Sequence, residues 1–248
     1  MSQPANPVTD AVLLGGGRDA ALAALFHIAP HPEVAGAQGV ALVLADLQHL
    51  LRETEVASLA PPQLGRAVAR RQLAYVAGRL CAEEALRRLG RPGAVQRGHE
   101  GEPLWPAQIC GSITHTDRIA CAMVVPQGVG RRGLGIDSEQ IDDDASLQAV
   151  LSICCTPGER AALFDTPGPA ARDRQVATVV FALKEAFYKA IHPSVARFVD
   201  FDEVDVADLD LDRGHARLQP RLPEWPANVS LPGRYAIVES TVHAVIDL

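Results

Sequence analysis

The sequence predicts an α+β fold, and three observations support this expectation. Two long segments, 61–89 and 174–191, carry apolar residues mostly at helical spacing. The other apolar segments are short, as strands are. Helices and strands follow one another without a regular βαβ rhythm, which favours α+β over a doubly wound sheet. The chain has 248 residues, enough for one large domain or two small ones.

The first half is expected to contain one long helix between strands. Its predicted elements are, in order, a buried strand at 39–47, a helix at 61–89, a loop at 101–106, a strand after Asp117 up to 125, and a hinge at 126–133. The helix ends where Gly90 and Pro92 break it.

The second half is expected to begin with the strand GLGIDSE, residues 133–139. The predicted elements that follow are a polar, helix-prone stretch at 140–172, a helix at 174–191, and strands near 199–206, 215–219, 233–239 and 242–247. We place a domain boundary in the hinge, with an N-terminal lobe at 1–130 and a C-terminal lobe at 131–248.

Composition narrows the classes of function. The net charge of −7 argues against a nucleic-acid partner. No apolar run approaches the roughly 20 residues of a membrane span, and no signal peptide is evident, so we expect a cytoplasmic protein. The five cysteines are odd in number and lack C-x-x-C spacing, which predicts small buried thiols in a reducing compartment.

Two carboxylates end the strand of residues 133–139. Asp137 and Glu139 flank Ser138, and side chains alternate across a strand, so both carboxylates project from one face. Adjacent carboxylates repel each other unless a cation joins them, and hard oxygen ligands suit Mg²⁺. Alone, this D-x-E pattern is more typical of a solvated strand edge.

The helix of residues 174–191 adds charged side chains beside its apolar stripe. Its segment FALKEAFYKA contains Lys184, Glu185 and Lys189. Glu185 and Lys189 could form an ordinary i,i+4 ion pair worth a few tenths of a kcal/mol. Alternatively, Glu185 is a third metal ligand and the two lysines neutralise a metal-bound pyrophosphate.

Other polar residues have a structural and a phosphate-binding interpretation. Thr114 and His115, in the segment SITHT, could contact phosphate or support a turn. Arg71 and Arg79 lie about two helical turns apart on the helix of residues 61–89, so both can face one anion or form part of a solvated basic face.

Three motifs in this order together resemble the 4′-phosphopantetheinyl transferases, in particular the large, two-lobed kind that includes the surfactin- and enterobactin-synthetase activating enzymes. They are W-P…G-S-I-T-H, G-I-D-S-E and F-A-L-K-E-A-F-Y-K-A. The resemblance extends from about Arg71 to Phe201. It implies two similar α+β halves related by a pseudo-twofold, with coenzyme A in the cleft between them. It also implies transfer of the phosphopantetheine arm of coenzyme A to a serine of an acyl, peptidyl or aryl carrier protein, with release of 3′,5′-ADP.

The resemblance also implies roles for individual residues. It makes Asp137, Glu139 and Glu185 the Mg²⁺ ligands, and it places Lys189 on the pyrophosphate with Lys184 beside it. It places Thr114 and His115 on coenzyme A phosphates, and Arg71 and Arg79 on the 3′-phosphate. Either Glu185 or water on the metal is the general base, and Asp137, Glu185 and Lys189 form the catalytic set.

One loop departs from the family pattern. Some members carry a lysine at or just before a Gly-x-Pro loop, whereas this chain has RGHEGEP with Glu100 and Glu102. Arg97 or backbone N–H groups of the loop are the possible replacements.

Two alternative functions stay open from the sequence. One is a Mg²⁺-dependent phosphohydrolase acting on coenzyme A or a nucleotide, and the other is a non-catalytic coenzyme A-binding protein. For the transferase we expect a monomer. Its carrier-docking surface would lie in the segment 141–163, unless the apolar residues of that segment pack into the second lobe. Those residues are Leu147, Val150, Leu151 and Ile153.

Overall fold

The computed structural model describes residues 18–248 except 66, 129, 142–143, 165–168 and 227. Contacts divide the chain into two units. The first unit contains the residues up to Ala29 together with Ala35–Gly128, and the second contains Pro30–Val34 and the chain after Gly128. The predicted N-terminal lobe includes Pro30–Val34 and ends at 130, so the two divisions differ in this short segment and by two residues at the hinge. That the units are the functional lobes stays a prediction.

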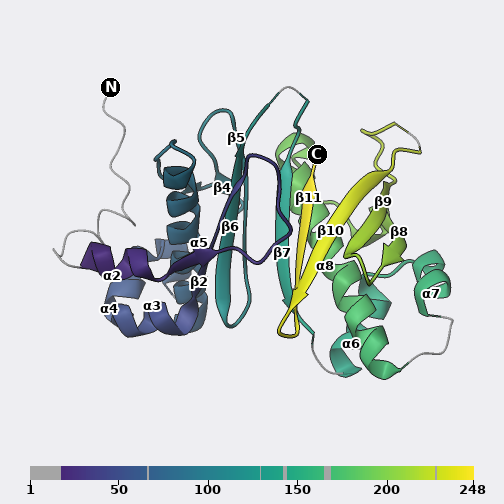
Figure 1. Ribbon diagram of the computed structural model, residues 1–248, viewed down its shortest axis with the longest axis horizontal. Coiled ribbons are helices and arrows are strands. Elements are labelled where there is room, and N and C mark those ends of the chain that lie inside the picture. Colours follow the sequence, from purple (N-terminus) through teal and green to yellow (C-terminus); the bar gives the residue numbers. More distant parts are fainter. Residues whose placement is uncertain (1–17, 66, 129, 142–143, 165–168, 227) are drawn as a thin grey trace. The chain divides into compact units, whose positions relative to one another are not determined.

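The first unit has one long helix against a mainly buried antiparallel sheet. Its elements are α2 (Arg18–Ala24), β1 (Phe26–Ile28), β2 (Gln38–Val43), α3 (Leu44–Leu50), α4 (Glu53–Leu59), η1 (Pro62–Leu64), α5 (Ala69–Arg88), β3 (Gln96–Arg97), β4 (Pro103–Leu104), β5 (Ile109–His115) and β6 (Ile119–Pro126). The sheet order is β1-β2-β6-β5, and β3 and β4 form a separate hairpin. Helix α5 packs on β2, β5 and β6 (Figure 1). Val76, Leu80 and Leu86 of α5 are buried in this core.

Three boundaries in this unit differ from the sequence predictions. The predicted strand 39–47 ends at Val43, and α3 begins at once. Leu44 and Leu47 are buried at helical spacing, so the apolar run contains two elements. The segment before Asp117 is a strand of its own, β5, which pairs with β6. The predicted helix 61–89 consists of η1 followed by α5.

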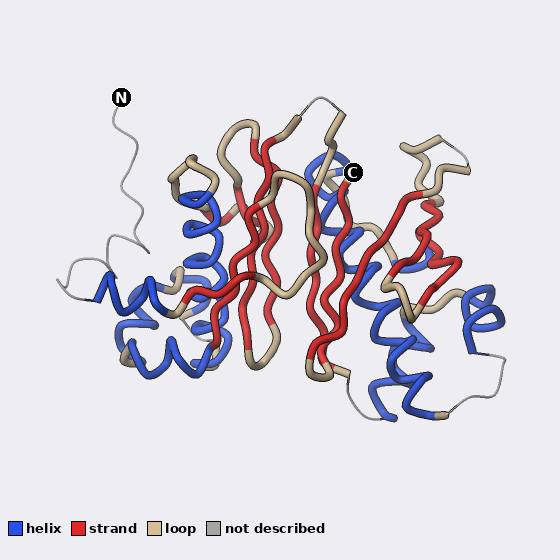
Figure 2. Tube along the Cα trace, in the orientation of Figure 1, coloured by secondary structure: helices blue, strands red, loops and turns tan. Residues whose placement is uncertain are grey.

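The second unit repeats the pattern of a long helix on an antiparallel sheet. Its elements are β7 (Leu134–Gln140), α6 (Asp144–Ile153), α7 (Pro157–Phe164), α8 (Ala170–Val195), η2 (Phe201–Glu203), β8 (Val204–Asp210), β9 (His215–Pro220), β10 (Leu231–Val238) and β11 (Thr241–Asp247). The sheet order is β7-β11-β10-β9-β8, so β7 is an outermost strand. Helix α8 lies against this sheet and contacts β7 and β11 (Figure 2). Leu183, Phe187 and Ile191 of α8 are fully buried.

The predicted α+β fold class is confirmed, because helices combine with all-antiparallel sheets in each unit. Four cysteines are buried thiols, as the sequence predicts; they are Cys81, Cys121, Cys154 and Cys155. Among the residues that the structure describes, none of the helices has both the length and the apolar character needed to span a membrane. The pseudo-twofold relation between the halves stays a prediction.

Candidate active site

Two glycines allow α8 to pack closely along β7. Gly133, just before β7, and Gly135 in β7 lie on the strand face that α8 covers. A Cβ atom at Gly133 would overlap the carbonyl oxygen of Ala190, and one at Gly135 would overlap that of Ala186. Because side chains alternate along a strand, Asp137 projects from the same face as these glycines. The close approach therefore brings the strand that bears Asp137 against the charged side chains of α8.

Asp137 and Lys189 form an ion pair between β7 and α8. Nζ of Lys189 lies 2.5 Å from Oδ1 of Asp137. The side chain of Asp137 is buried, with 4% exposure, whereas that of Lys189 keeps 28%. A charge-assisted bond of this kind orients the carboxylate, and the exposed part of the lysine can still meet a ligand.

Glu185 lies one helical turn before Lys189 and is half-buried. Burial raises the pKa of Glu185, the charge of Lys189 lowers it, and the negative charge of Asp137 raises it. The two carboxylates are therefore close enough to influence each other electrostatically. Glu139 is also half-buried, and the pleat directs it to the same face of β7 as Asp137.

These carboxylates offer the donor chemistry that Mg²⁺ prefers, with hard oxygens on two packed elements. Within the described residues, no group of three or more His, Cys, Asp or Glu side chains is gathered closely enough to hold a metal ion. Lys189 instead compensates the charge of Asp137. The donor set fits the cation, and the convergence of all three carboxylates stays a prediction.

Lys184 lies in a different environment from the one that the motif predicts. Its side chain has 0% exposure. Its Nζ donates to the carbonyl oxygen of Cys154 at 2.8 Å, to Oε2 of Glu159 at 2.7 Å and to the carbonyl oxygen of Phe201 at 2.8 Å. An ammonium group has three donors, so none is left for a phosphate oxygen. We therefore correct the assignment of Lys184 from phosphate contact to structural residue.

The first unit holds the residues assigned to the coenzyme A phosphates. Arg71 is exposed on α5, whereas Arg79 is 5% exposed, and its Nε donates to the hydroxyl of Tyr75 at 3.3 Å. Thr114 and His115 end β5, with Thr114 buried and His115 exposed. Arg71, Thr114 and His115 keep the predicted roles as proposals, while Arg79 also has a packing role against the Tyr75 ring.

The hydrogen bonds of the β3–β4 hairpin favour one of the two possible replacements for the missing loop lysine, which are Arg97 and the backbone N–H groups of the loop. The N–H of Gly98 donates to the carbonyl of Glu102, that of Glu100 to the Glu102 side chain, and that of Gly101 to the carbonyl of Gly98. These backbone donors are used within the loop. Arg97, which is half-buried and donates to the Gly98 carbonyl at 3.3 Å, is the better candidate for a phosphate contact.

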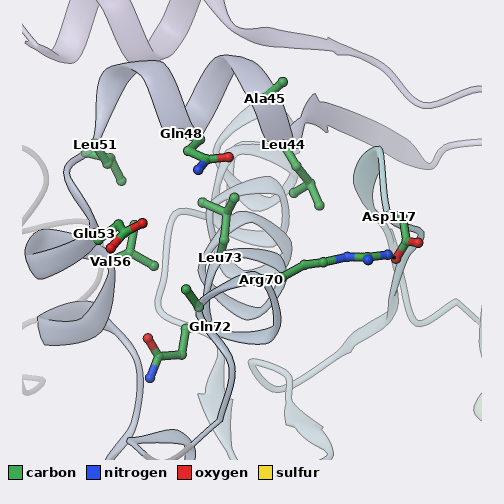
Figure 3. Close-up of a pocket in the computed structure, with 11 residues that line it drawn as sticks. Leu44, Ala45, Gln48, Leu51, Glu53, Val56, Arg70, Gln72, Leu73 and Asp117 are labelled. Atoms are coloured by element: carbon green, nitrogen blue, oxygen red, sulfur yellow. Dashed lines mark ion pairs between the residues drawn. The ribbon is translucent and has the colours of Figure 1, made fainter.

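A pocket of about 250 Å³ lies in the first unit, beside the start of α5 (Figure 3). Its lining residues are Leu44, Ala45, Gln48, Leu51, Glu53, Val56, Ala69, Arg70, Gln72, Leu73 and Asp117. Arg70 reaches across one side of the pocket to pair with Asp117. Arg71, Arg79, Thr114 and His115 do not line it, so this pocket is not the predicted phosphate site.

A buried polar group behind β7 has no counterpart in the sequence predictions. Oγ of Ser138 lies 3.1 Å from Nε2 of His31 and 2.9 Å from Nδ1 of His243. Burial, followed by the charge of His243, lowers the pKa of His31 to about 3, and burial lowers that of His243 to about 4. Both imidazoles are therefore neutral near pH 7. The contacts span more than 100 residues of sequence, so no local pattern reveals them.

The apolar side chains of the predicted docking segment 141–163 lie partly against the core and partly at the surface. Val150 and Leu151 of α6 pack against the core of the second unit. Ile153, at the end of the same helix, is 68% exposed. Residues 142 and 143 lie outside the described residues. Of the four apolar residues named for this segment, Ile153 is thus the exposed one, while Leu147, Val150 and Leu151 are half-buried.

Comparison with known proteins identifies the family. Residues 60–125 match the family model of the 4′-phosphopantetheinyl transferase N-terminal domain. Residues 133–240 match the model of the 4′-phosphopantetheinyl transferase superfamily. The chain is 34% identical over 226 residues to 4′-phosphopantetheinyl transferase PptT of Mycobacterium tuberculosis, covering 84% of this chain and 95% of the relative. It is 33% identical over 165 residues to 4′-phosphopantetheinyl transferase Npt of Nocardia iowensis, covering 64% and 71%. It is 31% identical over 140 residues to enterobactin synthase component D of Escherichia coli K12, covering 56% and 64%. The resemblance that the three motifs indicate is confirmed, and the chain belongs to the 4′-phosphopantetheinyl transferase family.

Proposed function

We propose that this chain transfers the 4′-phosphopantetheine group of coenzyme A to a serine of an acyl, peptidyl or aryl carrier protein, releases 3′,5′-ADP and depends on Mg²⁺. Membership of the family makes it an enzyme that places phosphopantetheine on carrier proteins. The proposal adds the leaving product and the metal. The observation that carries it is the Asp137–Lys189 pair on packed elements, with Glu185 one turn away.

Asp137, Glu139 and Glu185 would hold the metal through carboxylate oxygens. Bound Mg²⁺ supplies positive charge that neutralises pyrophosphate oxygens. Burial raises the pKa of Glu185, Lys189 lowers it and the negative charge of Asp137 adds a smaller rise; the repulsion between the two carboxylates favours a cation beside them.

Lys189 would bind the pyrophosphate directly. Its ammonium group pairs with Asp137, and its side chain is 28% exposed. It can therefore donate to a phosphate oxygen and stabilise the charge that grows on the departing 3′,5′-ADP. Asp137 keeps the ammonium group in place.

The transfer itself is a substitution at the β-phosphorus of coenzyme A. The serine oxygen of the carrier forms a bond to this phosphorus. The bond from the phosphorus to the oxygen that bridges to 3′,5′-ADP breaks, and its electron pair leaves with 3′,5′-ADP. The hydroxyl proton goes to Glu185 or to a water molecule. Glu185, one turn before Lys189 on α8, is the protein carboxylate proposed to accept it.

The first unit would bind the rest of coenzyme A. Arg71 is exposed on α5 and would pair with the 3′-phosphate, with Arg79 as a second, more enclosed donor on the same helix. Thr114 and His115, at the end of β5, would contact the other phosphates. Arg97 of the β3–β4 hairpin would take the place of the loop lysine.

The test is mass spectrometry of an apo carrier protein incubated with this enzyme, coenzyme A and Mg²⁺. We expect the carrier mass to increase by one phosphopantetheine group, with one 3′,5′-ADP released per carrier. Asp137→Ala should slow transfer by about 1000-fold, or ~4 kcal/mol, because a metal ligand and the partner of Lys189 are lost together. Near-normal transfer by this variant would contradict the site. Hydrolysis of coenzyme A without a carrier would favour the phosphohydrolase instead.

A further inference from the structure

A group of three buried side chains lies behind the strand that bears Asp137. His31, Ser138 and His243 are 7%, 1% and 2% exposed. Nε2 of His31 lies 3.1 Å from the carbonyl oxygen of Asp137 and 3.1 Å from Oγ of Ser138, which itself lies 2.9 Å from Nδ1 of His243. The two rings are in an edge-on arrangement, with centroids 5.2 Å apart.

The partners determine where the protons lie. A carbonyl oxygen only accepts, so Nε2 of His31 carries the proton and donates to Asp137 O. The Ser138 hydroxyl accepts from His31 and can donate to Nδ1 of His243. Nδ1 of His31 is buried and has no hydrogen-bond partner in the described part of the chain. The imidazole of His31 therefore makes its hydrogen bonds to β7 through Nε2.

Strand geometry connects this group to the carboxylates. Ser138 stands between Asp137 and Glu139 and projects from the opposite face of β7. Strand β7 is an outermost strand of its sheet, and in the part of the chain that the structure describes it pairs with β11. Bonds to the Asp137 carbonyl and the Ser138 hydroxyl restrict rotation of the strand about its own axis. Such a restriction keeps Asp137 and Glu139 directed towards α8.

His31 belongs to a short segment that is built into this unit. Residues Pro30–Val34 precede β2 in sequence, yet they group with the second unit by contacts. Val34 is 3% exposed, and the guanidinium of Arg234 in β10 donates to the carbonyl oxygen of Glu33. The segment therefore has attachments that do not involve β7, and these can be tested apart from the bond of His31.

We propose that His31 is a positioning residue, which fixes the main chain at Asp137 and Ser138 and thereby holds the metal-binding carboxylates in the direction that the reaction needs. The inference rests on the proposed metal site. A residue that orients a metal ligand by a hydrogen bond typically changes metal affinity by about 10–100-fold when it is removed. His31 acts on the ligand's main chain, so we expect the lower end of that range.

The experiment measures the dissociation constant of Mn²⁺ by electron paramagnetic resonance, with coenzyme A present and no carrier, so that no turnover occurs. His31→Phe keeps an aromatic ring and removes the Nε2 donor, and we expect it to weaken Mn²⁺ binding about 10-fold. His31→Gln places an amide N–H near the position of Nε2 and should return the constant to within about 3-fold of wild type. A purely structural role of His31 would lower the melting temperature without this pattern.

Val34→Ala is the matched control, because it loosens the same segment without touching the bonds to β7. It should lower the melting temperature and leave Mn²⁺ binding unchanged. Equal weakening by Val34→Ala, or unchanged binding by His31→Phe, would overturn the proposal. If His31→Phe does not fold, His31→Leu, which also lacks the Nε2 donor and is smaller, takes its place, and unchanged binding by that variant would also overturn the proposal. Wild type that binds no Mn²⁺ would instead reject the metal site of the proposed function.

Discussion

Lys184 and Lys189 occupy the same helix and the same motif, but their surroundings differ. Lys184 has three acceptors and 0% exposure, whereas Lys189 pairs with Asp137 and keeps 28% exposure. Helix α8 thus holds one lysine that joins parts of the second unit and one that a ligand can reach. The motif specifies two lysines but does not tell their roles apart. Their burial does, because the enclosed Lys184 is structural and the accessible Lys189 can meet a ligand.

The same division recurs on two other helices. On α5, Arg79 is 5% exposed and packs on Tyr75, whereas Arg71 is exposed. On α6, Val150 packs into the core, whereas Ile153 is 68% exposed. In each pair, we expect substitution of the buried member to change folding and substitution of the accessible member to change binding or transfer.

The largest effect on folding should come from Lys184→Met. Removing one partner of a buried ion pair leaves the other charge uncompensated, which costs about 3–5 kcal/mol. Glu159 would stay 2% exposed, held by the N–H groups of Thr156 at 2.8 Å and Val206 at 2.6 Å. Chemical denaturation should show this loss in the free energy of unfolding. At a temperature where the variant stays folded, its transfer rate should remain within a few-fold of wild type.

If Lys184→Met is as stable as wild type but has lost most of its transfer rate, the structural role of Lys184 is contradicted. Lys184 would then contact the substrate after a rearrangement of its three acceptors. Glu159→Gln gives an independent control, because it keeps one carbonyl oxygen and removes the negative charge. It leaves the buried Lys184 ammonium group without a negative partner, so we expect it to destabilise the fold by an amount similar to Lys184→Met, again with transfer within a few-fold of wild type.

Lys189→Met should have the opposite profile. The ammonium group would no longer stabilise charge on the pyrophosphate, and loss of such a donor slows reactions by about 100-fold or more. The loss of unfolding free energy should be smaller than for Lys184→Met, because one bond is broken instead of three. Steady-state transfer kinetics and denaturation of both variants, measured side by side, test this. Lys189→Arg keeps the charge and should recover part of the rate; equal rates for Lys189→Met and wild type would remove Lys189 from the site.

Local patterns predict much of the fold and part of the site. Apolar residues at helical spacing locate α8, and the pleat places Asp137 and Glu139 on one face of β7. The burial of Lys184 also had a local signal. Val180, Phe187 and Ile191 are buried, and residue 184 falls between them at i+4 from the first and i−3 from the second. A lysine in the middle of an apolar stripe predicts an enclosed partner.

The remaining features depend on contacts between distant parts of the chain. The partner of Lys184 is 25 residues away, and His31 meets Asp137 across 106 residues. Contacts over such separations leave no periodic pattern in the sequence from which they could be predicted. The boundary between β2 and α3 was missed for another reason: the apolar run 39–47 continues through both elements, and a continuous run does not distinguish a strand from the start of a buried helix.

The arginine pair on α5 gives a smaller effect on binding. Arg71→Ala should weaken coenzyme A binding by about 1–3 kcal/mol, since one charge-assisted bond to the 3′-phosphate is lost from an exposed side chain. Calorimetric titration with coenzyme A and with dephospho-coenzyme A, which lacks that phosphate, provides the control. Equal losses for the two ligands would show that Arg71 does not bind the 3′-phosphate. Arg79→Ala should lower the melting temperature as well, because Arg79 packs on Tyr75.

The smallest effect should appear on α6, where the carrier is expected to dock. Ile153 is 68% exposed at the end of this helix, so a charge there meets water in the free enzyme and costs little stability. In a complex, Ile153→Glu would place a carboxylate against an acidic carrier and remove apolar contact, raising the KM for the carrier by roughly 5-fold, or about 1 kcal/mol. Coenzyme A binding should not change. Val150→Glu is the matched control, because Val150 is partly buried against the core and a charge there should lower the free energy of unfolding. If Ile153→Glu leaves the carrier KM unaltered while the protein stays folded, the docking surface lies on another part of the chain.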